Sequence, residues 1–437
     1  MQKKQSTARE LIAFSLPLIM SGILQQLYSW ADAFIIGRAE GELPLAAVGA
    51  TTSISYFLIN TILGFTLGLS IMGAQHFGRG DKDSVRRIKS CFLPLLTAAY
   101  AVLSALAYAF AAPILRLMNT PADIFEDALG YLQIIFAGIP FLACYNLYAA
   151  LLRAVGNTKA AFYAVLLSSA LNVVLDVLFV VFFGWGVTGA AAATVLSQMA
   201  MTLFIILYAV RKYPYLRRRR GEVHFDRSVF AQGMRFSVPP TVQNSVTSLG
   251  NLVLQNFMNS FGSVTVLAIT TAYRVDSMML LPIFNLGAAV SSMTARAKGA
   301  NDEARIRSCF LTGNGLMIAV CAVLSVFMFL FGAWFVGIFG VTGEALAIGR
   351  QFFRDLSIFY TLFGVGIVLR SVLEGVGDLT CASLIGMGML AARIAFSYLL
   401  RPLLAGRTIA IAEGIAWILM LAALVWRMRV LHKRKTA

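Results

Sequence analysis

Long apolar stretches recur along the whole chain. A helix of about 20 apolar residues crosses the ~30 Å hydrocarbon core of a bilayer. The stretches are continuously apolar rather than alternating, which argues against the strands of a membrane β-barrel. We therefore expect an all-α polytopic membrane protein. Its twelve transmembrane helices are predicted at about residues 11–36, 47–73, 93–115, 128–152, 160–183, 187–210, 233–258, 264–294, 309–337, 347–371, 381–400 and 408–427.

The composition supports the same class of protein. Apolar residues make up 59% of the 437-residue chain and charged residues only 13%, whereas soluble proteins carry about 25% charged residues. A soluble protein with so few charges could not cover its surface with polar groups. Five cysteines are also too few for a disulfide scaffold of this length.

The basic residues indicate how the chain is oriented. Lys and Arg gather in the connections on the side of the N-terminus, above all at 79–89, 211–227, 296–307 and 427–435. This asymmetry predicts that both termini lie in the cytoplasm. Four consecutive arginines at 217–220 contribute to the net charge of +16. A polybasic segment beside the membrane is expected to meet anionic lipid headgroups of the bilayer, and we expect no nucleic-acid partner.

The chain contains an internal repeat. RIKSCFL at 87–93 recurs as RIRSCFL at 305–311, and FSLP at 14–17 recurs as FSVP at 236–239. The repeat indicates two pseudo-symmetric six-helix lobes, and the even number of spans gives both lobes the same orientation. Two such lobes beside a central cavity are typical of carriers that work by alternating access. The predicted domains are an N-lobe at 1–211, a basic cytoplasmic linker at 212–228 and a C-lobe at 229–437.

The N-lobe spans contain polar side chains at helical spacing. Gln25, Tyr28 and Asp32 share one face of the first span, and Pro17 is expected to kink the same helix. Side chains facing lipid would stay unsatisfied, so we expect the polar groups to converge inside the lobe. The other polar residues of these spans that we single out are Ser21, Asn146, Ser169, Asn172, Asp176, Thr194 and Gln198.

Asp32 and Asp176 constrain the function most. A charged side chain at the bilayer centre costs roughly 2.5–3.5 kcal/mol, and the N-lobe spans offer neither acid a Lys or Arg partner. Acids buried together in this way are suited to bind and release H⁺, and an all-oxygen cluster can equally ligate Na⁺. The alternative is that the polar residues make interhelical hydrogen bonds that only stabilise the bundle. No other metal site is expected, since the three histidines lie outside the spans.

The C-lobe carries a different set of charges. Ser397 stands at the position equivalent to Asp176. Arg393 is expected to pair with Asp276 or Glu413 and to have a structural role. The charged residues whose part in transport the sequence leaves open are Arg274, Asp276, Arg393 and Glu413.

The order of these motifs resembles the multidrug and toxic compound extrusion (MATE) family. The matching motifs are the first-span pattern from Pro17 to Asp32 followed by FIIGR at 34–38, then RAVGNT at 153–158, then Asn172-x-x-x-Asp176. The twelve helices in two lobes match along essentially the whole chain. The pattern is closer to the DinF-like and archaeal members than to the branch with essential acids in helices 7 and 10, because no mid-helix carboxylate stands there.

The resemblance implies a V-shaped antiporter of the prokaryotic plasma (inner) membrane. Such a protein exports small organic, often cationic molecules in exchange for H⁺ or Na⁺, without another cofactor, and we expect it to be a monomer. Pro17 matches the proline proposed to bend on protonation. Matching positions imply a cation site at Asp32, Asn172, Asp176 and Thr194. They imply a drug cavity at Gln25, Tyr28 and Asn146, to which we add Gln198.

Other functions remain possible on the sequence alone. The same superfamily architecture supports a flippase or exporter of a lipid-linked or anionic precursor, which would need cationic cavity residues such as Arg274 and Arg393. A membrane-embedded enzyme would need a nucleophile–base pair or metal ligands at membrane depth. The spans contain no histidine and no HExxH motif, so we expect no enzyme. A channel is not expected to combine this duplication with one buried acidic cluster.

Overall fold

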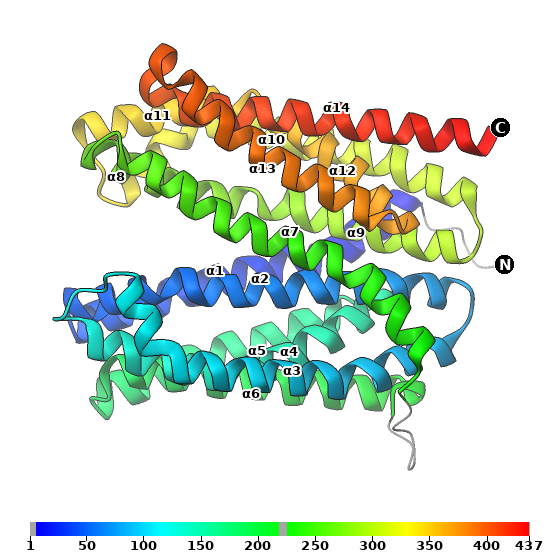
Figure 1. Cartoon of the computed structure of the whole chain (residues 1–437), viewed down its shortest axis with the longest axis horizontal. Helices are drawn as coiled ribbons and strands as arrows, with labels where there is room; N and C mark the ends of the chain where they lie inside the picture. Colours follow the sequence, from blue (N-terminus) through cyan, green and yellow to red (C-terminus); the bar gives the residue numbers. More distant parts are fainter. Residues whose placement is uncertain (1–5, 218–224, 437) are drawn as a thin grey trace. The chain divides into compact units, whose positions relative to one another are not determined.

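The computed structural model describes residues 6–217 and 225–436, and nearly all of these residues are helical (Figure 1). Arg217 of the predicted lipid-binding run is described, whereas the following three arginines lie outside the described residues. The predicted all-α class is confirmed for this part of the chain.

The helices of the described chain agree with twelve spans. Nine segments are long and apolar enough to cross a membrane, or ten when a pair bent by 51°, α11 (Gly343–Ser357) and α12 (Tyr360–Val376), counts as one span. One of the nine segments contains two successive helices, α13 (Leu379–Leu404) and α14 (Thr408–Thr436). The twelfth helix is α7 (Arg227–Asn259), which is long enough to span but carries many polar side chains.

The helices pack into two compact units. The N-unit consists of Pro17–Val238, and the C-unit consists of the residues up to Leu16 together with those from Pro239 onwards. The division therefore falls inside α1 (Thr7–Ala39) and inside α7, at the two prolines that the repeat relates. The units differ from the predicted lobes at these two helices. The C-unit includes the first turns of α1, and the N-unit includes the first turns of α7.

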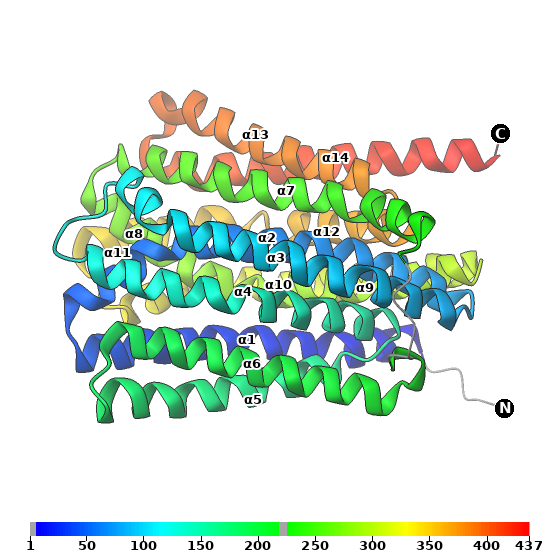
Figure 2. The ribbon, with the colours of Figure 1, turned by 60° about the horizontal axis from the view of Figure 1, so that its bottom comes forward.

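In the N-unit, α4 (Phe125–Ala154) is the central helix. It packs against α2, α3 and α6, and it buries Leu132, Phe136 and Leu151 completely. α5 (Lys159–Asp176) lies beside α6 (Figure 2). The other bounds are α2 (Glu42–Gly78), α3 (Lys82–Leu117), α6 (Gly186–Lys212) and the 3₁₀-helix η2 (Pro214–Leu216).

The C-unit repeats this arrangement around α12. That helix packs against α9, α10 and α14, and α13 packs against α14. The predicted span 264–294 consists of two helices that meet at Leu280. The second helix begins at Leu281, and Pro282 in its first turn has no backbone N–H to donate. The start of α1 and the end of α14 lie at the same end of this unit (Figure 1). The remaining elements are α8 (Ser263–Met279), α9 (Leu281–Gly299), α10 (Glu303–Ile338) and the 3₁₀-helix η3 (Ala405–Arg407).

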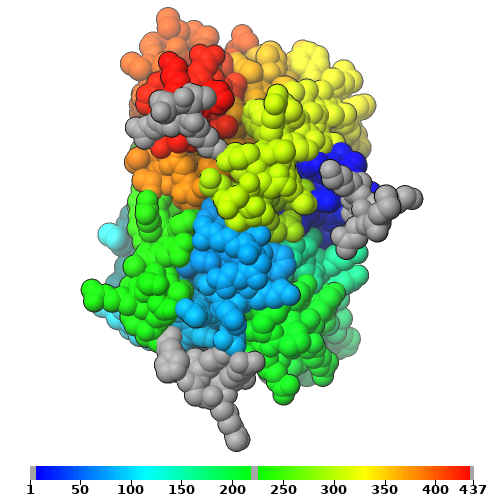
Figure 3. Space-filling model, turned by 90° about the vertical axis from the view of Figure 1, so that its right-hand side faces the viewer, coloured from blue at the N-terminus to red at the C-terminus, as the bar shows by residue number. Residues whose placement is uncertain are grey.

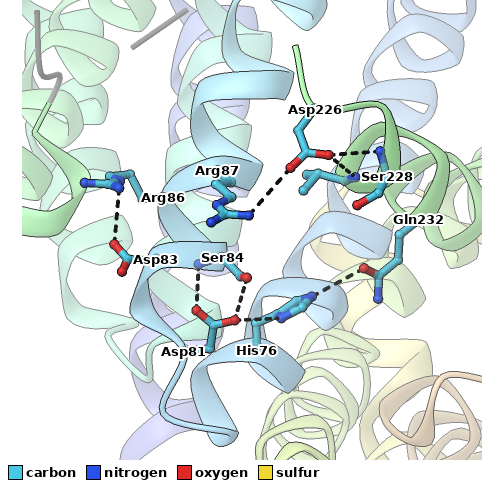
Figure 4. A network of polar contacts seen from close by, with 10 residues as sticks. His76, Asp81, Asp83, Ser84, Arg86, Arg87, Asp226, Ser228 and Gln232 are labelled. Carbon is cyan, nitrogen blue, oxygen red and sulfur yellow. Dashed lines mark hydrogen bonds and ion pairs between the residues drawn. The ribbon is translucent and has the colours of Figure 1, made fainter. Parts of the chain in front are cut away.

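The first turns of α7 are held in the N-unit by α3. Asp226 accepts hydrogen bonds from the backbone amides of Ser228 (3.0 Å) and Val229 (3.2 Å) and pairs with Arg87 of α3 at 3.7 Å (Figure 4). The Val229 amide bond is the main reason why the pKa of Asp226 lies below its usual range. The green residues around the start of α7 adjoin the light-blue α2–α3 turn in Figure 3.

The turn between α2 and α3 is closed by a helix cap. Asp81 accepts hydrogen bonds from the Ser84 backbone amide (2.9 Å) and the Ser84 hydroxyl (2.5 Å), and these bonds lower the pKa of Asp81. His76 at the end of α2 lies between Asp81 (3.7 Å) and Gln232 of α7 (3.4 Å), as Figure 4 shows. The cap thus also touches the start of α7.

The C-unit holds the start of α1 in the equivalent way. Arg305, the counterpart of Arg87, donates a hydrogen bond to Glu10 at 2.7 Å. Thr7 and Ser308 share a hydrogen bond of 2.7 Å. The dark-blue start of α1 lies against the yellow-green α9–α10 region in Figure 3. The repeated RI(K/R)SCFL motif therefore supplies one arginine to each of these two attachments.

Candidate functional site: an acidic pair in the N-unit

Asp32 and Asp176 are brought together by the packing of their helices. Ile36 of α1 and Val180, which follows α5, belong to one buried apolar cluster. Each acid precedes its apolar residue by four positions, which is about one helical turn. The two carboxylates are near enough for their charges to interact. Along their helices, the two acids therefore lie about one turn before this apolar cluster.

The two carboxylates lack partners. The Asp176 side chain is fully buried, and neither of its oxygens accepts a hydrogen bond from any described residue. The Oδ1 atom of Asp32 is likewise buried without a hydrogen bond in the described chain. Burying a carboxylate charge without hydrogen bonds or a counter-charge is strongly unfavourable. These oxygens are consequently available to a proton or a small cation.

A short π-helix, η1 (Val177–Phe182), begins directly after Asp176. π-Helical turns are rare and occur frequently at functional sites. Here the wide turn is held by aromatic packing, because the Phe179 ring stacks on Trp185 with centroids 4.9 Å apart. Gly189 of α6 permits this contact, since a Cβ atom there would lie 2.9 Å from the Trp185 Cβ. The π-helix thus forms the last turns of the span that carries Asp176.

An amide and two hydroxyls lie on α5 and α6, on the helix that carries Asp176 and its neighbour. Asn172 is one turn before Asp176 and 1% exposed, and its Nδ2 atom lies 3.5 Å from the Thr194 hydroxyl. The Asn172 Oδ1 atom and the Ser169 hydroxyl have no hydrogen-bond partner among the described residues. No group of three or more His, Cys, Asp or Glu side chains converges in the described chain. A bound Na⁺ would therefore need these amide and hydroxyl oxygens beside the carboxylates.

The four residues expected to line a drug cavity lie in different surroundings. Tyr28 is near both acids, because its phenol interacts electrostatically with Asp32 and Asp176. Asn146 is buried and donates a hydrogen bond to the Leu142 carbonyl one turn back, at 2.9 Å. The remaining two side chains are Gln198, which lies against Gly138 of α4, and Gln25, which is exposed.

Pro17 lies where α1 passes from the C-unit to the N-unit. Its ring leaves the helix without one backbone hydrogen bond. Ser21 donates its hydroxyl to the Pro17 carbonyl at 2.7 Å, a type of contact that often bends helices. Both features make this part of α1 a suitable place for a change of direction.

Two tyrosines near the acids were not predicted from the sequence. Tyr131 of α4 packs on the apolar cluster of Ile36 and interacts electrostatically with Asp32. Tyr56 of α2 interacts with Tyr28 in the same way. Tyr131 lies inside a predicted span, and a buried tyrosine hydroxyl usually has a polar neighbour. Its position along α4 does not show, however, that it packs near Asp32 of α1.

The C-unit charges form a network of their own. Arg393 donates hydrogen bonds to Glu413 (3.0 Å) and to the Tyr273 hydroxyl (2.7 Å). Of the two acids considered for Arg393, the structure thus pairs it with Glu413, while Asp276 accepts a hydrogen bond from Tyr360. Arg274 is exposed. The Arg393 charge is neutralised within this unit.

A family model described as MatE matches the chain twice, at residues 17–178 and 239–399. The chain belongs to the MatE family. Both matches begin at the prolines that separate the two units. The expected MATE membership is therefore confirmed, and the double match agrees with the internal repeat.

Named relatives and solved structures agree with this assignment. "Probable multidrug resistance protein YoeA" of Bacillus subtilis is 27% identical, with 88% of this chain and 85% of the relative covered. YpnP of the same organism, also described as a probable multidrug resistance protein, is 28% identical, covering 84% and 82%. A crystal structure of a MATE protein in complex with MaL6 has a TM-score of 0.91 at 23% identity, covering 99% and 98%. This last likeness confirms the fold.

Proposed function

We propose that the protein is a secondary active multidrug exporter that exchanges organic, cationic or lipophilic compounds for H⁺ or Na⁺. The observation that carries the proposal is the pair Asp32 and Asp176. Asp176 is fully buried, Asp32 is half-buried with a buried Oδ1 atom, and these buried oxygens have no hydrogen-bond partner in the described chain. The similarity to relatives named multidrug resistance proteins supports the substrate class. MATE membership supports a transporter rather than an enzyme.

The acids supply a reason for exchange. With no ion bound, the pair carries uncompensated negative charge, and a lipophilic cation in the lobe is attracted to it. With H⁺ or Na⁺ bound, the charge is reduced and the cation is bound more weakly. Ion and substrate then lower each other's affinity by the same factor, as thermodynamic linkage requires. Alternating access of the two lobes would turn this competition into antiport.

The proposed roles follow the positions around the pair. Asp32 and Asp176 bind the coupling ion, and Asn172 and Thr194 complete its polar surroundings. Tyr28 joins this site to the substrate region, in which Gln25, Asn146 and Gln198 contact the exported molecule. Pro17 allows α1 to bend when the ion binds.

The proposed setting is the bacterial plasma (inner) membrane. Both termini are proposed to lie in the cytoplasm, which the basic connections on the side of the N-terminus support, and the protein is proposed to work as a monomer. The alternative of exporting a lipid-linked or anionic precursor through Arg274 and Arg393 is less well supported, because Arg393 is already paired with Glu413.

Everted membrane vesicles test the proposal. Uptake of a fluorescent lipophilic cation is measured with a pH gradient and a Na⁺ gradient imposed separately, and the effective gradient identifies the ion. Asp32→Asn and Asp176→Asn are expected to abolish gradient-driven uptake at unchanged protein level. Asp123→Asn, which changes an exposed acid in the connection before α4, serves as the control. Undiminished gradient-driven uptake in Asp32→Asn would refute the assigned site.

A further inference from the structure

The C-unit has an open groove between α10 and α11 that the transport site does not use. Its volume is about 660 Å³, within the range of small-molecule sites. One wall is the apolar face of α10, including Leu330, Trp334 and Ile338, whose side chains are 63%, 63% and 59% exposed. In a chain that spans the bilayer, such a face is in contact with lipid.

The other wall of the groove is basic. Arg350 and Arg354 of α11 both line it, and residues four apart on a helix are neighbours on one face. The Arg354 guanidinium lies over the Phe329 ring of α10, 5.6 Å from its centroid, which directs it into the groove.

Neither arginine is neutralised by a described acid. The adjacent Asp355 forms its ion pair with Arg407 at 2.7 Å instead. Two positive charges with no acidic partner in the described chain therefore lie beside an apolar, lipid-facing surface. This combination is complementary to an occupant that has an anionic end and an apolar body.

We propose that this groove binds an anionic phospholipid of the surrounding bilayer. The lipid phosphate lies between Arg350 and Arg354, since guanidinium groups bind phosphate with paired hydrogen bonds. An acyl chain follows the α10 wall past Trp334, a residue type that favours the level of the headgroups. The bound lipid would connect α10 to α11, the first part of the bent span α11–α12.

Native mass spectrometry of the full chain tests the proposal. The purified protein is titrated with phosphatidylglycerol and, separately, with zwitterionic phosphatidylcholine. Retained phosphatidylglycerol is expected in the wild type, with binding about 30-fold weaker in the double variant Arg350→Gln/Arg354→Gln, since each basic residue contributes a factor of about five. Arg116→Gln is the matched control, because Arg116 also lies over a phenylalanine ring, Phe125, outside the groove. Equal retention by the double variant, or equal binding of phosphatidylcholine, would overturn the proposal.

A second measurement does not depend on the folding of the arginine variants. Phosphatidylglycerol brominated in its acyl chains is expected to quench Trp334 fluorescence more than brominated phosphatidylcholine at the same density. The fluorescence that is lost in Trp334→Phe identifies the contribution of Trp334 to the total signal. Inorganic phosphate and glycerol phosphate are expected not to compete, because they lack the acyl chain. Equal quenching by both lipids, or competition by inorganic phosphate, would contradict a phospholipid site.

Discussion

Gly68 of α2 lies directly against the backbone carbonyl of Phe236 in α7. A Cβ atom at position 68 would be 2.3 Å from that carbonyl oxygen. The contact lies within the N-unit, although α7 begins the second half of the sequence. The first turns of α7 are thus packed on α2 at backbone distance, which only glycine allows.

Replacing this glycine is expected to destabilise the N-unit. In Gly68→Ala the methyl group meets backbone, which cannot move aside as a flexible side chain would, so we expect a loss of about 1–3 kcal/mol in the free energy of unfolding. Gly49→Ala in the same helix is the control, since nothing lies within 4 Å of its Cβ position. Thermal unfolding in detergent measures both, and equal midpoints for the two variants would contradict the close contact.

The cap of α3 makes a small contribution to stability that depends on pH. Because hydrogen bonds from Ser84 lower the pKa of folded Asp81 from 3.8, the contribution is complete above the unfolded pKa. It is lost as the pH falls through the lowered, folded pKa. Asp81→Asn keeps an oxygen that can accept the Ser84 hydrogen bonds but removes the negative charge at the start of α3. It is therefore expected to lower stability by about 0.3–1 kcal/mol near neutral pH, and by less below about pH 4.

Thermal midpoints of wild type and Asp81→Asn across this pH range check the prediction. Asp83→Asn serves as the control, because Asp83 is 70% exposed and its ion pair among the described residues is with Arg86, three residues away. A difference between Asp81→Asn and wild type that grows as the pH falls would have the wrong sign.

The C-unit network is expected to be structural. Glu413→Gln removes the partner of Arg393, whose side chain is only 19% exposed, and an uncompensated buried charge costs about 3–5 kcal/mol. Asp276→Asn keeps an oxygen that can accept the Tyr360 hydrogen bond and should cost less. Thermal unfolding compares the two variants. Asp276→Asn should also retain gradient-driven uptake, and its loss in a stable variant would show that this half takes part in ion coupling.

The sequence predicts most of the fold because each membrane-spanning helix corresponds to a continuous apolar stretch that can be recognised directly. Breaks within the helices are harder to predict. Pro282 indicates the break between α8 and α9. The helix break after Ser357 and the π-helix after Asp176 lie inside apolar stretches, where the hydropathy does not change. The sequence also does not show that the first turns of α1 belong to the C-unit and the first turns of α7 to the N-unit. The repeat relates Pro17 to Pro239 but does not indicate which unit each helix start joins.

The site is predicted only along single helices. Helical spacing identifies Asn172 and Asp176 as one face, and lack of basic partners singles out the acids. Spacing cannot show how helices pack on one another, so Tyr131 was missed. It also cannot distinguish the exposed Gln25 from Tyr28, which lies near the acids.

The most direct test is the binding of a fluorescent lipophilic cation to purified protein, with its Kd measured as the pH falls and as Na⁺ is added. In the wild type, the coupling ion is expected to weaken binding by about 5–150-fold, the usual range of linked sites. In Asp32→Asn/Asp176→Asn the Kd should no longer respond to that ion. If the double variant shows the same ion dependence as the wild type, the acidic pair is not where the ion binds.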